Sequence, residues 1–103
     1  MKTVLVYVTN PTKKEAEKIA RHLLGKRLIA CANIFPVESL YWWKNKIKKS
    51  KEFVLIGKTT DGKYQKIVGE VEKIHSYSVL CVAKLPVEFN KKYKKWLIGE
   101  IGK

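Results

Sequence analysis

The chain has few of the residues that define several common classes of protein. Its 103 residues include two cysteines, Cys31 and Cys81, with no CxxC pair and no regular zinc-ligand spacing. Two cysteines do not make the disulfide framework of a small secreted domain. No apolar run approaches the roughly 20 residues that cross a bilayer, and the apolar part of the N-terminus is too short for a signal peptide. We therefore expect a cytoplasmic protein with no membrane partner.

Sequence motifs of the common enzyme families are also missing. The chain contains no GxSxG, no HExxH and no glycine-rich phosphate loop, and Asp61 is its one aspartate. Such motifs supply nucleophiles, metal ligands and phosphate contacts. A dyad of Cys31 and His75 would need an exposed thiolate, which an apolar strand disfavours. The sequence therefore predicts a protein that is not an enzyme.

Charge of one sign is abundant. Twenty lysines and two arginines stand against nine acidic residues, which gives a net charge of +13. This balance attracts polyanions without specificity at low salt. The scarcity of arginine argues against a dedicated nucleic-acid surface, because bidentate phosphate and guanine contacts favour the guanidinium group. We expect the lysines to form solvated faces and predict no specific nucleic-acid partner.

Apolar periodicity predicts alternating strands and helices within one domain, residues 1–103. A β-branched run at 3–9 indicates a buried strand. The helix that follows has Thr12 and Glu15 spaced as a capping box, and Gly25 is placed to end it as a left-handed cap. Further strands are expected at 28–37, 52–59 and 79–85, the last stopped by Pro86. A helix starts at 60–62, and a short C-terminal helix follows Asn90.

Between the second and third strands the sequence predicts a projecting β-hairpin. Tyr41, Trp42 and Trp43 extend the second strand, and the chain turns at 44–46. Three large rings on a projecting arm are too apolar to leave in water, which indicates an interface.

The order of elements indicates an α+β protein with a ferredoxin-like βαββαβ fold: an antiparallel sheet with two helices on one face, plus the hairpin and the extra C-terminal helix. The second and last strands should form opposite edges, too far apart for Cys31 and Cys81 to form a disulfide. Both edges should be long and unpaired, and one sheet face lacks a cover. Pairing between subunits would protect both features.

RNA-recognition domains share this topology and provide an alternative function. Tyr7 fits the shorter of their two aromatic signatures, and Phe53 fits one position of the longer. Glu52 stands where glycine is expected, however, and Leu55 where the main stacking ring belongs.

The chain resembles the CutA divalent-cation-tolerance family across nearly its whole length. The shared residues are Glu15–Ala20 with Leu24, Leu28–Ile34, Pro36, Ser39–Trp43, Ile47, Glu52, Lys58, Thr59, Tyr64, His75, Tyr77 and Tyr93–Leu97. The segment Cys31-Ala32-Asn33 with the Tyr-x-Trp downstream is the most specific of these. The chain departs from the family at Ser76 and Leu80, where prolines are usual.

This resemblance implies a cytoplasmic homotrimer that is similar in architecture to the PII signalling proteins. It also implies tolerance of divalent cations, copper especially, through weak copper binding. Thiolate and imidazole suit copper or zinc, so Cys31 and His75 are the candidate ligands for copper(II) or another divalent cation, although they supply only half of a tetrahedral site. The candidate cleft and interface residues are Asn33, Tyr41, Trp42, Trp43, Lys58, Thr59, Tyr77 and Trp96.

Simpler interpretations of these residues remain open. Cys31 and Cys81 in apolar strands are typical of small core residues, and His75 is placed to cap a helix C-terminus. His22 lies on the polar side of the first helix and is expected to be solvated. Lys58 and Thr59 could meet an anion or end a strand. A trimeric scaffold that is indifferent to metals is the third functional alternative.

Overall fold

A computed structural model describes all residues, 1–103. Four strands form one antiparallel sheet in the order β2-β3-β1-β4. This arrangement confirms the predicted ferredoxin-like α+β fold. The elements in chain order are β1 (Thr3–Asn10), α1 (Lys13–Gly25), β2 (Cys31–Trp43), β3 (Lys46–Thr60), a 3₁₀ turn (Asp61–Lys63), α2 (Tyr64–Ile74), β4 (Val82–Val87) and α3 (Lys91–Ile101).

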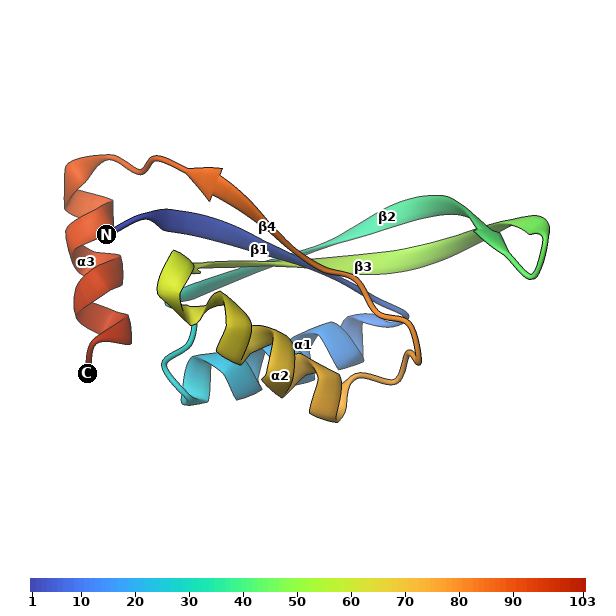
Figure 1. Cartoon of the computed structure of the whole chain (residues 1–103), viewed down its shortest axis with the longest axis horizontal. Coiled ribbons are helices and arrows are strands. Elements are labelled where there is room, and N and C mark those ends of the chain that lie inside the picture. The colour runs from blue at the N-terminus through green and yellow to red at the C-terminus, as the bar shows by residue number, and fades with distance from the viewer.

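Helices α1 and α2 cover one face of the sheet, and α3 lies at one end of it (Figure 1). The core lies between this face and the two helices. It includes Val4, Val6 and Val8 of β1, which pack with Ile19 of α1 and Ile67 of α2. Because side chains alternate along a strand, the residues between the core valines point away from the helices. We call this second side of the sheet the open face.

The open face is largely apolar and has no layer over it. The register places Leu5 beside Leu85 and Tyr7 beside Ile56 on this side. Phe35 is 39% exposed and Leu85 is 48% exposed. The predicted uncovered face is therefore present, and α3 covers only its end.

Helix α1 begins at the predicted cap residue, but its capping box is incomplete and it ends differently from the prediction. Thr12 is the N-cap, and its hydroxyl accepts a hydrogen bond from the Glu15 N–H (3.1 Å). The second half of the capping box does not form, because the Glu15 carboxylate accepts hydrogen bonds from the N–H and hydroxyl of Ser76 instead. Gly25 is the last helical residue, and Arg27 rather than Gly25 adopts the left-handed conformation (φ 58°).

Strands β2 and β3 continue well beyond β1 as a two-stranded arm. The arm consists of β3 residues 46–52 and their β2 partners 37–43, and the third strand thus begins earlier than predicted. Lys44 and Asn45 form its turn with φ values of 50° and 62°. Two positive values are typical of the type I′ turn that suits the twist of a hairpin. The arm makes the molecule elongated, with extents of 45 × 24 × 21 Å (Figure 1).

The prediction for the last strand was wrong at both ends. β4 begins at Val82, and it continues through Pro86 to Val87. Proline is tolerated here because β4 is an edge strand and needs donors on only one side. Residues 75–81 form a loop between α2 and β4. The β4 edge is therefore six residues long. The β2 edge is long, as expected, but β2 begins at Cys31, three residues later than predicted, and continues to Trp43.

Close packing between β3 and the segment before β2 requires a glycine. A Cβ atom on Gly57 would lie 2.9 Å from Cγ2 of Ile29, and Ile29 is only 2% exposed. The hydroxyl of Thr59 on the same strand donates a hydrogen bond to the Leu28 carbonyl (2.6 Å). Gly57 and Thr59 together fix the chain that leads into β2.

Candidate functional site

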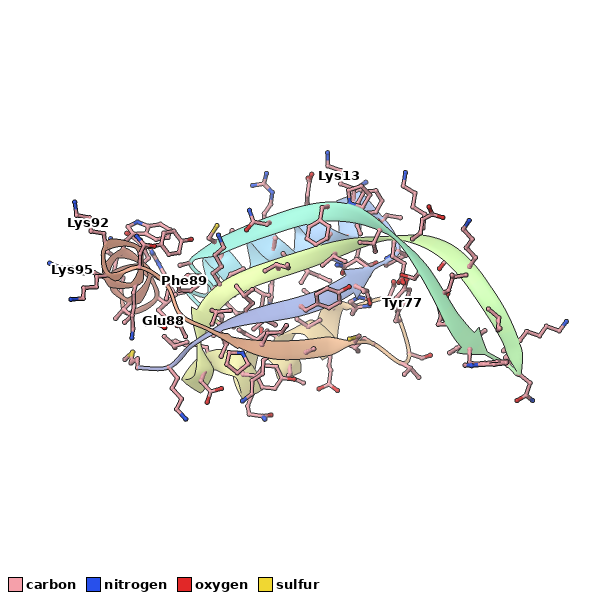
Figure 2. All side chains as sticks on the ribbon, turned by 90° about the horizontal axis from the view of Figure 1, so that it is seen from above. Lys13, Tyr77, Glu88, Phe89, Lys92 and Lys95 are labelled. Atoms are coloured by element: carbon pink, nitrogen blue, oxygen red, sulfur yellow. The ribbon has the colours of Figure 1, made fainter.

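The predicted site residues fall into two groups at different places on the sheet. Cys31 and Lys58 are opposite each other near α3. Tyr41, Trp42, Trp43 and Tyr77 line a cavity of about 820 Å³ at the arm. Figure 2 shows Tyr77 beside the point where the arm leaves the sheet, well separated from Lys92 and Lys95 of α3. The chain therefore does not form one cleft from all the candidates.

We call the second of these sites the arm cavity. Its walls come from the arm, from the end of β1 and from the loop that precedes β4. The other lining residues are Thr9, Pro11, Ser39, Lys48, Ser50, Lys51, Glu52, Ser76, Ser78, Val79 and Cys81.

Glu52 and Tyr77 form the central polar contact of the arm cavity. The Tyr77 hydroxyl donates a hydrogen bond to Oε2 of Glu52 (2.7 Å). Glu52 is 7% exposed. Burial and then the contact with Glu52 raise the pKa of Tyr77 far above its usual range, so the phenol keeps its proton and continues to donate. Nearby, the hydroxyls of Tyr41 and Ser50 are hydrogen-bonded at 3.0 Å.

His75 holds the loop wall of this cavity and has no free ring nitrogen. Its side chain is fully buried. Nε2 lies 2.8 Å from the Thr9 carbonyl and must donate to it, while Nδ1 accepts a hydrogen bond from the Tyr77 N–H (3.0 Å). An oxygen of Glu15 lies 3.5 Å from Nδ1. These partners define a neutral, Nε2-protonated imidazole in a structural role.

Cys31 and His75 do not come together within one subunit. The register places Cys31 beside Lys58, and Lys58 beside Leu5 of β1. His75 contacts Thr9, four residues further along β1, or roughly 13 Å at the rise of a strand. No group of three or more His, Cys, Asp or Glu side chains is placed to hold a metal ion. The donors of one subunit therefore do not fit a closed copper site.

The site near α3 combines a thiol, a phenol and an amine. Cys31 is half-buried. Burial and then the neighbouring Cys31 raise the pKa of Tyr93, while Lys58 opposes this effect. The Lys58 amine lies 5.2 Å from the centre of the Tyr93 ring. The ring of Trp96, which is 45% exposed, lies 5.4 Å from that of Tyr93, and the two ring planes are tilted by 47°.

The remaining candidates have structural or isolated positions. Thr59 is fully buried, and its hydroxyl donates a hydrogen bond to the Leu28 carbonyl. It is therefore not available to bind an anion. Asn33 is exposed and pairs with Ile56 between the two sites. The interpretation of Cys81 as a core residue was wrong, because it lies in the loop before β4 and is exposed.

His22 is also not the freely solvated residue that was expected. Its Nε2 lies 2.8 Å from a carboxylate oxygen of Glu70. Hydrogen bonds from Lys73 and His22 lower the pKa of Glu70 from 4.5 to about 2, against the smaller effect of burial. This cluster joins α1 to α2 on the outer surface of the helices, away from both sites.

Sequence analysis did not select Glu52 as a site residue. A signal was available in the sequence. Glu52, Val54 and Ile56 are spaced two positions apart, so they lie on the same side of β3. A carboxylate at an alternating apolar position indicates a buried acid, and a buried charge needs a partner.

The sheet also decides against an RNA-stacking platform. Tyr7 pairs with Ile56, so both point to the open face. Phe53 and Leu55 are an odd number of positions from Ile56 and point to the opposite side, and Leu55 is part of the core. The two aromatic signatures would therefore present their rings on different faces.

The βαββαβ sheet with a long β2–β3 arm defines a class of ferredoxin-like α+β proteins, and comparisons with known proteins narrow it to a family. The model of the CutA1 divalent ion tolerance protein family matches residues 4–100. The chain therefore belongs to the CutA1 divalent ion tolerance family.

Individual relatives agree with this assignment. The chain is 42% identical over 93 residues to the divalent-cation tolerance protein CutA of Archaeoglobus fulgidus, covering 89% of this chain and 91% of the relative. It is 43% identical over 95 residues to CutA of Thermotoga maritima, covering 91% and 94%. The solved structure of the A. fulgidus protein, described as periplasmic, superimposes with a TM-score of 0.93 at 39% identity, covering 96% of this chain and 98% of that one. CutA1 of Pyrococcus horikoshii gives 0.90 at 37% identity, covering 94% and 96%.

The chain contains no helix of sufficient length and apolar character to cross a membrane. A relative from rice, 37% identical over 97 residues, is named as chloroplastic, and this chain spans 55% of its length.

Proposed function

We propose that this chain is a non-catalytic, homotrimeric protein of the cytoplasm that acts in the response to divalent metal ions, copper in particular. The observation that carries the proposal is the pair of uncovered apolar surfaces, the open face and the arm. Metal tolerance is the property in the names of its relatives.

The arm displays more apolar surface than a solitary chain would keep in water. Leu40 is 71% exposed, Trp42 is 72% exposed and Ile47 is 66% exposed. Contiguous exposed apolar patches of this kind mark interaction sites. The arm projects from the sheet, so it can reach a sister chain and can cover apolar residues there. The long unpaired β2 edge gives the same sister chain a strand to pair with.

We propose that copper, or another divalent cation, binds weakly at Cys31, which presents a soft ligand. His75 has no part in this proposed site, because both of its ring nitrogens are engaged by Thr9 and Tyr77. The other coordination positions would fall to water or to a sister chain. Both cysteines are free, which suits a reducing cytoplasm.

Light scattering of the purified protein tests the assembly. We expect a mass of about three chains that does not change with salt, because apolar burial rather than charge holds the contact. Phe35→Asp on the open face should lower the mass. Leu24→Asp is the matched control, because Leu24 is 37% exposed on α1 and Phe35 is 39% exposed. A monomeric wild-type protein would refute the proposed assembly.

Copper titration against a chromophoric competitor tests the metal role. Cys31→Ala should lower the copper stoichiometry, and Cys81→Ala should leave it unchanged. Equal stoichiometry in the wild type and Cys31→Ala would exclude this thiol as the ligand. A trimer that takes up no copper would instead be the metal-indifferent scaffold.

A further inference from the structure

Glu52 is buried without a cation, although the chain carries 22 lysines and arginines. The comparison with Glu70 makes this clear, because the two carboxylates are almost equally buried, at 7% and 8% exposure. Glu70 lies within 4.0 Å of the amines of Lys26 and Lys73 and of the imidazole of His22. Glu52 takes part in none of the contacts within 4.0 Å between acidic and basic side chains in the molecule. Its one side-chain hydrogen bond comes from a neutral phenol, that of Tyr77.

A buried carboxylate of this kind costs free energy unless a positive group meets it. One neutral hydrogen bond to Oε2 does not compensate a full charge. Lysines line the same cavity at positions 48 and 51, yet neither amine lies within 4.0 Å of Glu52, and Lys51 instead lies 5.8 Å from the centre of the Phe53 ring. The chain itself thus supplies no counter-charge at this point.

The surroundings of Glu52 suit an organic cation. Tyr41, Trp42, Trp43 and Tyr77 line the arm cavity with it. Aromatic faces attract ammonium groups through their quadrupole, and rings that surround such a group are the usual recognition device for alkylated ammonium ions. A volume of about 820 Å³ is within the range of pockets for small molecules.

We propose that the arm cavity binds an ammonium group, which contacts the Glu52 carboxylate and the rings of Tyr41, Trp43 and Tyr77. The group belongs to a small alkylammonium compound or to a lysine side chain of a second copy of this chain. Both sources offer the same chemistry. The site is additional to the proposed metal response, which does not require it.

The donor set favours an organic cation over a metal ion. Glu52 is the one carboxylate in the lining, and the other polar groups are neutral hydroxyls, two lysines and the thiol of Cys81. Hard cations take six or more oxygen ligands, which this lining does not offer. The two lysine amines repel any cation, but they repel a divalent ion about twice as strongly as a singly charged ammonium group. Apolar rings contribute nothing to coordination but contribute directly to ammonium binding.

Tryptophan fluorescence provides the assay, because Trp42 and Trp43 line the cavity, while the third tryptophan, Trp96, belongs to α3. The probe is choline, and its neutral isostere 3,3-dimethyl-1-butanol has the same shape without the charge. We expect saturable quenching by choline and none by the alcohol. Glu52→Gln keeps the size and the acceptor for Tyr77 and should weaken choline binding about ten- to a hundredfold, the loss expected when one of two opposite charges in contact near a protein surface is removed. Glu38→Gln is the matched control, since Glu38 is an exposed glutamate of the same arm.

Two further measurements complete the design. Light scattering of Glu52→Gln distinguishes the sources: if free choline does not bind and this variant alone loses oligomeric mass, the ammonium group is a lysine of the sister chain. Tyr41→Leu removes one ring without changing any charge, and it should weaken binding several-fold even if Glu52→Gln does not fold.

Three results would overturn the proposal. The alcohol could bind as well as choline, or Glu52→Gln could match the wild type in both binding and mass. The third is saturable quenching by Mg²⁺ or Cu²⁺ that depends on Glu52 while choline has no effect.

Discussion

Replacing His75 by phenylalanine would separate its structural role from the role of a metal ligand. The change keeps a planar ring but removes both nitrogens. The Thr9 carbonyl and the Tyr77 N–H, which His75 satisfies at 2.8 and 3.0 Å, would lose their partner at a fully buried side chain. A buried polar group without a partner costs about 1–3 kcal/mol. The variant should therefore lose about 2–6 kcal/mol, a large part of the 5–15 kcal/mol typical of a whole domain.

Amide replacements at His75 should give intermediate results. The oxygen of asparagine is near the position of Nδ1 and can still accept from Tyr77, while the longer glutamine can still donate to Thr9. Each keeps one hydrogen bond and should lose about half as much, roughly 1–3 kcal/mol. The free energy of unfolding should therefore be highest for the wild type, lower for the two amide variants and lowest for the phenylalanine variant.

Urea unfolding at one fixed chain concentration measures this series, because assembly makes apparent stability depend on concentration. A parallel copper titration should show no change in stoichiometry for any of the three variants. If phenylalanine unfolds within about 0.5 kcal/mol of the wild type, the scatter expected for a neutral surface change, and copper binding is lost, the structural assignment of His75 is refuted.

Three other changes give direct tests in urea unfolding. Gly57→Ala should destabilise the fold by about 1–3 kcal/mol through overpacking against Ile29. Its control is Gly69→Ala in α2, where a Cβ meets nothing within 4 Å, and this change should stabilise by about 0.5–1 kcal/mol. Equal effects of the two changes would refute the close contact between Gly57 and Ile29. Because the folded pKa of Glu70 is lowered from 4.5 to about 2, its contribution to stability is complete above pH 4.5 and is lost as the pH falls toward 2. Glu70→Gln should not show this loss in midpoints measured across that range, and a loss identical to the wild type would contradict the assignment. Lys44→Gly should gain about 0.5–1 kcal/mol by relieving a left-handed residue at φ 50°, and a loss of stability would contradict the turn geometry.

Local patterns were sufficient to predict most of the fold. The spacing of Ala16, Ile19 and Leu23 specifies the buried side of α1, and all three are buried. Alternation along β1 similarly specifies its core side. These features depend on neighbours in sequence, so periodicity reports them well.

Features that depend on distant contacts could not be predicted. Glu15 and Ser76 are 61 positions apart, and no local pattern shows that the loop serine takes the carboxylate from the capping box. Cys81 lies in an apolar run that is typical of a strand, but pairing with β1 starts only at Val82. The predicted cleft residues separate into two sites for the same reason. Residue types and motifs suggested one cleft, but the register of the strands places Cys31 and Tyr77 at different points along the sheet.

The unequal margins of the sheet have a consequence for uncontrolled polymerisation. Stacking of identical sheets into a fibre requires two receptive borders on every copy, one to donate and one to accept. β4 offers only six residues, and Pro86 removes one of their amide hydrogens. Growth by strand addition is therefore disfavoured on that side, and open-ended stacking of sheets is disfavoured with it.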